Sequence, residues 1–212
     1  MTLSARAMLF VKERSRQFEY LGMAIAAVII IYLGINTYMK YINKKGQNVY
    51  NLAYSALSKN MESNKNRDEL KRSEELFKEV IDRYGRSKVS NLALPELAYI
   101  KFLGKKYDEA ISLYKEFLNQ VPDKATYQSM ARMALAACYE EKGDFKMAIE
   151  TLEQVMSGPD DLFKEQAMLN LARVYRLAHQ QEKSKNILKE FIKKYGNSPF
   201  LPLAKAHVEQ SP

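Results

Sequence analysis

Few residues of this 212-residue chain have the types and spacing that catalysis or metal binding requires. It has one cysteine, Cys138, and two histidines, His179 and His207, too few for a disulfide framework, a cysteine zinc site or a histidine relay. Cys138 lies within a stretch of helical apolar periodicity, so we expect a small buried hydrophobe rather than a reactive thiol. We expect both histidines to be ordinary surface or partly buried residues.

Paired carboxylates are the remaining candidates for acid–base chemistry. The members of Glu140–Glu141 and of Asp160–Asp161 are adjacent in sequence. Neighbouring helical residues point in different directions, so neither pair is expected to form one shared site. The sequence contains no G-x-S-x-G, phosphate-binding loop, dinucleotide fingerprint or H-E-x-x-H. We therefore predict a protein that is not an enzyme, with no cofactor, metal or small-molecule substrate.

The net charge of +8 does not indicate nucleic-acid binding once it is divided along the chain. Residues 1–45 hold seven Lys or Arg and two acidic residues, which accounts for +5 of that charge. In residues 46–212, basic and acidic residues are interspersed, as in LKRSEELFKEVIDRYGR. Binding to phosphates needs basic residues concentrated on one face of the folded part. We expect no nucleic-acid partner.

The segment from Tyr20 to Met39 is free of charged residues and mostly apolar. As a helix it would be about 30 Å long, which matches the hydrocarbon core of a bilayer. Tyr and Phe near both ends, with Lys and Arg beyond them, are typical of the headgroup levels. A core helix of this length would have a polar face, and a cleaved signal peptide would have a shorter apolar region followed by a small-residue cleavage site.

We therefore predict an uncleaved transmembrane anchor over residues 18–42. A short basic segment, residues 1–17, would precede it, and a juxtamembrane linker, residues 43–48, would follow. Four basic residues precede the span and three follow it, a slight bias that favours a cytoplasmic N-terminus. The expected protein is a single-pass inner (plasma) membrane protein whose large domain is periplasmic.

The rest of the chain repeats itself. The segment LAYIKFLGKKYDEAI (97–111) aligns with LAACYEEKGDFKMAI (135–149) at a shift of 38, and LARVYRLAHQQEKSK (171–185) follows at a shift of 36. Apolar residues recur at helical spacing in each copy, so each unit should consist of two helices. Gly104 and Gly143 are expected to mark the turns between them.

Small residues are expected where the two helices of a unit come closest. Ala98 with Ala110, and Ala136 with Ala148, would let the backbones approach without side-chain collision. One hairpin cannot cover its own apolar face, so the units must stack.

These units resemble the tetratricopeptide repeat (TPR) family, in which a 34-residue helix–turn–helix carries small and large residues at fixed places. The second unit matches best, at Leu135, Ala136, Tyr139, Gly143, Phe145, Ala148 and Leu152. The resemblance implies an all-α fold in which the transmembrane helix is followed by an α-solenoid of about four TPR-like hairpins. The expected domain covers residues 49–210, with a degenerate unit at 49–88, units at 91–124, 129–161 and 165–198, and a closing helix at 200–210. About eight extra residues, centred on ESNKNRDE, lie within the degenerate unit.

In the TPR family the first helix of each unit lines a concave face that binds partners. Carried over to this chain, the groove-facing positions are Tyr99, Phe102, Leu103, Met130, Met133, Ala137, Glu140, Gln166, Asn170, Arg173 and Arg176. This series begins aromatic, becomes rich in methionine and ends basic, which suits an extended or helical peptide with apolar anchors and an acidic end. The alternative is that Tyr99, Met130 and Met133 pack against the neighbouring unit.

An uncleaved anchor followed by about four such units is similar to the YfgM-like ancillary subunits of the bacterial translocon. This resemblance implies protein–protein interaction in the bacterial cell envelope, near the Sec translocon or periplasmic chaperones. The partners would be proteins or peptides on the concave face, and lipid around the N-terminal helix. The alternative function is a structural scaffold subunit of a multi-protein envelope assembly or secretion complex.

Overall fold

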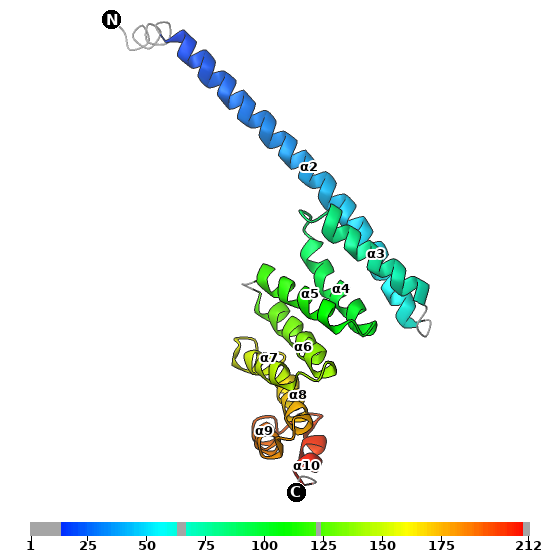
Figure 1. The fold of residues 1–212 in the computed structure, drawn as a ribbon. Helices are drawn as coiled ribbons and strands as arrows, with labels where there is room; N and C mark the ends of the chain where they lie inside the picture. The colour runs from blue at the N-terminus through cyan, green and yellow to red at the C-terminus, as the bar shows by residue number, and fades with distance from the viewer. Residues whose placement is uncertain (1–13, 63–66, 122–123, 210–212) are drawn as a thin grey trace, which may run out of the picture.

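The computed structural model describes residues 14–62, 67–121 and 124–209. Within these ranges the chain forms nine α-helices and no β-strand (Figure 1). The helices are α2 (Ser15–Glu62), α3 (Arg67–Arg83), α4 (Ser90–Leu103), α5 (Tyr107–Gln120), α6 (Ala125–Glu141), α7 (Phe145–Ser157), α8 (Lys164–Leu177), α9 (Gln181–Lys194) and α10 (Leu201–Glu209). Most of the predicted basic N-terminal segment lies outside the described residues, as do residues 63–66 of the polar insertion and the last residue of the predicted closing helix.

Each helix packs on its neighbours in sequence, which produces a solenoid. The hairpins are α2–α3, α4–α5, α6–α7 and α8–α9, and α10 packs on α9 at the end of the stack. Figure 1 shows the hairpins stacked along one direction, with the N-terminal half of α2 projecting away from them. The predicted all-α solenoid of about four hairpins and a closing helix is confirmed for the described residues.

The first helix differs from the predicted series of anchor, linker and repeat helix. α2 is continuous over 48 residues, so residues 43–48, predicted to be a linker, are helical. The reason is tertiary packing, since Ile42 and Gly46 are buried. A Cβ atom on Gly46 would lie 2.7 Å from the Ser87 Oγ, and the Asn43 side-chain oxygen accepts a hydrogen bond of 2.9 Å from the Lys88 backbone N–H. These contacts hold α2 against the turn between α3 and α4.

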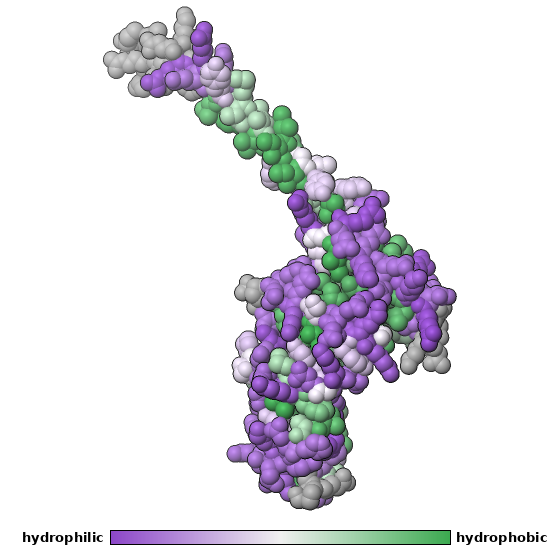
Figure 2. Space-filling view, in the orientation of Figure 1, coloured by the Kyte–Doolittle hydropathy of each residue, from purple (hydrophilic) through white to green (hydrophobic). Residues whose placement is uncertain are grey.

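The apolar half of α2 packs against nothing else in the described chain. Residues 20–35 are all exposed, and Figure 2 shows them as an apolar band between the polar N-terminal end and the solenoid. By length and composition this helix could cross a membrane, and none of its most apolar window is buried. A core helix would instead be buried in the fold.

Each hairpin is closed by a pair of small residues that are almost fully buried. These pairs are Ala53–Ser73, Ala98–Ala110, Ala136–Ala148 and Ala172–Ser184. In the two outer pairs the serine hydroxyl donates a hydrogen bond to the alanine carbonyl oxygen on the facing helix, 2.8 Å for Ser73 and 2.7 Å for Ser184. Hence serine replaces alanine without leaving a buried hydroxyl unpaired.

Large side chains fill the space beside these pairs. Phe77, Val155 and Phe191 are at most 1% exposed, and they lie in three successive clusters of the core. Cys138 belongs to the largest cluster and is fully buried, which confirms its predicted role as a small hydrophobe. Burial raises the pKa of the Cys138 thiol to about 12, so it stays protonated at neutral pH.

Three of the turns share a backbone geometry that the sequence only partly indicates. Gly143, Lys105 and His179 have φ values of 80°, 58° and 58°, and the next residue in each turn donates a backbone hydrogen bond across the helix end. Gly104, which we expected to mark the turn of the first unit although it lies one place early in the repeat alignment, has an ordinary φ of −78°. The residue with positive φ in this turn is Lys105, which directly follows Gly104 in the sequence.

A buried lysine joins three helices at the start of the solenoid. Lys101 of α4 is 4% exposed, and its ammonium pairs with Glu74 of α3 at 2.9 Å and with Glu109 of α5. Burial alone would lower the pKa of Lys101, but the hydrogen bonds to the two carboxylates outweigh it and raise the pKa. The lysine therefore stays charged and cross-links α3, α4 and α5.

The small-residue pairs can be tested with one substitution at two adjacent positions. Ala136 of α6 is 2% exposed and belongs with Ala148 of α7 to the largest core cluster, whereas Ala137 is partly exposed. We expect Ala136→Arg to lower the free energy of unfolding by about 3 kcal/mol or more, because the guanidinium would be forced between two close helices. The matched control, Ala137→Arg, should cost no more than about 1 kcal/mol. Denaturant unfolding followed by circular dichroism measures both, and equal losses would contradict this packing.

The left-handed turns give a second test with opposite signs. Lys105→Gly and His179→Gly should each raise the free energy of unfolding by about 1 kcal/mol, because glycine adopts positive φ without strain. Gly143→Ala should lower it by about as much. Thermal unfolding of the three variants measures these shifts. Gly104→Ala is the control and should change little from backbone strain, since its φ is negative.

Candidate protein-binding groove

The eleven predicted groove residues all lie on first helices of the hairpins. Three are on α4, four on α6 and four on α8. None is fully buried, and the exposed members are Leu103, Met130, Gln166, Arg173 and Arg176. The structure thus places the whole series at or near the surface of three successive hairpins.

The aromatic and methionine members divide between core packing and exposure. Tyr99 and Met133 are partly buried and pack against core clusters, as the alternative interpretation expected. Phe102 also packs on the core, and its ring centroid lies 5.7 Å from that of Tyr107. Met130, by contrast, is 51% exposed, so it is available to a partner.

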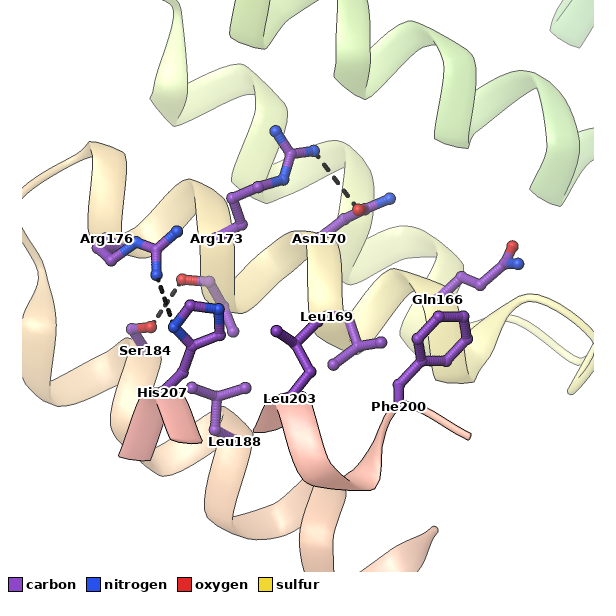
Figure 3. Close-up of a pocket in the computed structure, with 11 residues that line it drawn as sticks. Gln166, Leu169, Asn170, Arg173, Arg176, Ser184, Leu188, Phe200, Leu203 and His207 are labelled. Atoms are coloured by element: carbon purple, nitrogen blue, oxygen red, sulfur yellow. Dashed lines mark hydrogen bonds between the residues drawn. The ribbon is translucent and has the colours of Figure 1, made fainter. Parts of the chain in front are cut away.

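The polar members join α6 to α8. The Arg173 guanidinium forms an ion pair with Glu140 and donates a longer hydrogen bond of 3.4 Å to the Asn170 side chain (Figure 3 shows the latter). The side chains of Arg173 and Glu140 are 45% and 12% exposed. The pair is therefore partly shielded from water, and one edge of Arg173 remains accessible.

The C-terminal part of this series lines a pocket of about 370 Å³, here called the α8–α10 pocket. Gln166, Leu169, Asn170, Ala172, Arg173 and Arg176 of α8 line it, with Ser184 and Leu188 of α9 and Phe200, Leu203 and His207 from the C-terminal segment. In Figure 3 the leucines and Phe200 lie across its lower part, and the two arginines lie at one side. Arg176 donates a hydrogen bond of 3.1 Å to His207 Nδ1, which joins α8 to α10.

Sequence reasoning missed the contribution of the closing helix. We expected it only to cover the last apolar face, and Ala204 does so, being fully buried with Phe191 and Met168. Phe200 and Leu203 are nevertheless 40% and 51% exposed. Phe200 directly precedes α10, and its spacing of i, i+3 and i+7 with Leu203 and His207 was the available indication that the three side chains share one side.

The residues that could do acid–base chemistry are dispersed. Glu140 pairs with Arg173, whereas Glu141 accepts a hydrogen bond of 3.2 Å from the Tyr107 hydroxyl. The Asp161 carboxylate pairs with Lys164 at 2.9 Å. Among the described residues, no three His, Cys, Asp or Glu side chains gather as a metal site.

Comparison with known families identifies the class of protein. A family model described as a tetratricopeptide repeat-like domain matches residues 16–158, and a tetratricopeptide repeat model matches residues 166–198. Since the first model alone covers more than half of the chain, this protein belongs to the tetratricopeptide repeat-like family. Proteins of this family generally bind other proteins.

Solved structures share the fold at low sequence identity. A Podosopora anserina protein, described as a kinesin light chain with nearly identical TPR-like repeats, is 14% identical with a TM-score of 0.62, over 80% of this chain and 86% of that one. A tetratricopeptide repeat protein from Parabacteroides merdae is 16% identical with a TM-score of 0.62, over 78% of this chain and 59% of that one. A double mutant of MamA from RS-1 is 14% identical with a TM-score of 0.56, over 82% and 88%. No curated protein matches the sequence.

The exposure of the α8–α10 pocket can be tested on adjacent residues of α10. We expect Leu203→Asp to change the free energy of unfolding by no more than about 0.5 kcal/mol, because this side chain is half exposed. Ala204→Asp should cost about 3 kcal/mol, because it buries a carboxylate in an apolar cluster. Unfolding of the full chain in detergent measures both values. A large loss for Leu203→Asp would mean that the pocket wall belongs to the core.

Proposed function

We propose that this chain is a single-pass, membrane-anchored TPR protein that binds other proteins in the bacterial cell envelope. The apolar half of α2 is the anchor, and the solenoid lies on the periplasmic side of the inner membrane. The observation that carries this proposal is the continuity of α2, which joins an exposed apolar stretch directly to the first hairpin of a TPR solenoid.

Exposure of the apolar residues supports the anchor. A band that includes Ile25, Ile29 and Leu33, each more than half exposed, would drive aggregation in water but is stable in lipid. Tyr20 and Tyr38, at its two ends, are also exposed, and tyrosine favours the headgroup level of a bilayer. The family match begins at residue 16, so the apolar stretch is part of the matched domain.

The surface of the first helices supports protein binding. Met130, Phe200 and Leu203 offer exposed apolar contacts, and Arg173 and Arg176 lie beside the last two. A peptide with apolar anchors and an acidic end fits this arrangement, because methionine and aromatic rings pack adaptably and arginine pairs with carboxylates. The resemblance to YfgM-like subunits favours partners near the Sec translocon or periplasmic chaperones.

Binding without catalysis is the expected mode of action. The Cys138 thiol is buried and protonated, and the adjacent carboxylates face different partners. An anchor would raise the effective concentration of the solenoid near other membrane-associated chains. Affinity would then come from proximity as well as from the contacts of the groove.

A photo-crosslinking residue introduced into the full chain in cells tests this function. Met130, Gln166 and Leu203 are suitable positions, because all three are exposed on the candidate groove. Asn119 and Lys146, exposed on the second helices α5 and α7, are matched controls. We expect the chain to stay in carbonate-washed membranes and the groove positions to capture proteins that the controls do not.

The captured set also separates binding from scaffolding. Many exported proteins in small amounts would indicate a binding module, and one partner in constant proportion would indicate a scaffold subunit. Equal capture by Asn119 and Lys146 would contradict the groove, and release by carbonate would contradict the anchor.

A further inference from the structure

Two distant parts of the sequence bring basic side chains together where α2 enters the solenoid. Lys40, Lys44 and Lys45 lie on α2, and Arg86 and Lys88 lie in the turn between α3 and α4. All five are exposed, and none of them forms an ion pair within the described part of the chain. We call these five residues the juxtamembrane basic cluster.

The turn is held firmly against α2. The Lys88 backbone N–H donates to the Asn43 side chain at 2.9 Å, and Gly46 leaves no room for a Cβ atom beside Ser87. Figure 1 shows this turn at the end of the solenoid that is nearest the projecting half of α2. The backbone at Arg86 and Lys88 is therefore fixed against the segment of α2 that carries the three lysines, by contacts that do not depend on the membrane.

The height of the cluster matches the headgroup layer. At a rise of about 1.5 Å per residue, Asn43 and Gly46 lie about 6 and 10 Å beyond Met39, the last residue of the apolar stretch. Each headgroup layer is about 5–8 Å thick, so the level of Asn43 falls within that layer and the level of Gly46 just outside it. The turn therefore lies at the outer edge of the headgroups, where long basic side chains can reach the lipid phosphates. The nearby acidic residues do not cancel the charge, because Glu79 is already paired with Arg83 at 2.9 Å and leaves only Asp82.

We infer that the juxtamembrane basic cluster binds the phosphates of anionic phospholipids and holds the solenoid against the membrane surface. This inference rests on the proposed anchoring of α2. Arginine binds phosphate through two parallel N–H donors, and lysine contributes a point charge. A basic residue near an anionic bilayer surface strengthens binding about fivefold. Since α2 is rigid through the junction, this second contact sets the tilt of the solenoid and the direction in which its groove faces.

The absence of tryptophan from the chain provides a clean probe. Tyr84→Trp places a single fluorophore at the turn, and Phe200→Trp places one at the far end of the solenoid. Each full-length variant is reconstituted into vesicles of phosphatidylcholine, with or without phosphatidylglycerol, that contain lipids brominated near the headgroup. We expect phosphatidylglycerol to increase quenching at position 84 but not at position 200, and high salt to abolish the increase.

A pair of substitutions that removes two positive charges tests the residues themselves. Arg86→Gln with Lys88→Gln should remove the phosphatidylglycerol-dependent quenching of the position-84 probe. Lys189→Gln with Lys193→Gln removes the same charge from the exposed face of α9 and should leave it unchanged. Circular dichroism checks that both variants remain folded. If the first pair unfolds the chain, Arg86→Gln alone and the salt dependence of the parent chain decide the matter.

The possible failures are distinguishable. Quenching at position 84 that does not respond to phosphatidylglycerol, or that falls equally with the α9 pair, would overturn the lipid-binding inference while the anchor stands. An acidic protein would then be the remaining candidate ligand for the cluster. A chain that does not float with the vesicles would overturn the anchor, and the inference with it.

Discussion

The close approach of two helices at a pair of small residues is the constraint on which this structure depends. At Ala53–Ser73, Ala98–Ala110, Ala136–Ala148 and Ala172–Ser184 any larger side chain would separate the backbones. With the helices close, the neighbouring large residues form one row of core clusters along the stack. Because each hairpin buries its remaining apolar face only against the next, the fold is an extended solenoid with a long surface.

That architecture explains why binding is the function it supports. A solenoid presents a long surface, and several of its charged residues pair between neighbouring helices. Glu140 with Arg173 joins α6 to α8, and Lys101 joins α3, α4 and α5. Exposed apolar side chains remain on the first helices and in the C-terminal segment, where Phe200 and Leu203 line a pocket together with Arg173 and Arg176. A surface of this kind suits the proposed binding of a protein or peptide chain.

The junction of α2 with the solenoid links the two halves of the proposed function. A flexible linker would let the groove face any direction, whereas a continuous helix that packs through Asn43 and Gly46 fixes the groove relative to the span. The same contacts place Arg86 and Lys88 beside the lysines of α2. In the proposed function, these contacts of the first hairpin would set the orientation of the solenoid toward the membrane.

Much of the fold was predictable from the sequence. The apolar run, the helical periodicity and the alanine spacing are local, and each depends on residues a few turns apart. The juxtamembrane linker expected at residues 43–48 is part of a continuous helix that packs on a turn some forty residues away, a contact that no local pattern indicates. The position of Lys105 in the left-handed turn, the burial of Lys101 and the lining of the α8–α10 pocket by Phe200 and Leu203 likewise required the packed structure. Sequence alone determined that helical hairpins must stack behind an apolar helix, because periodicity records which faces must be buried. Only the tertiary structure decided which side chains meet, because those contacts join helices whose spacing no local pattern encodes.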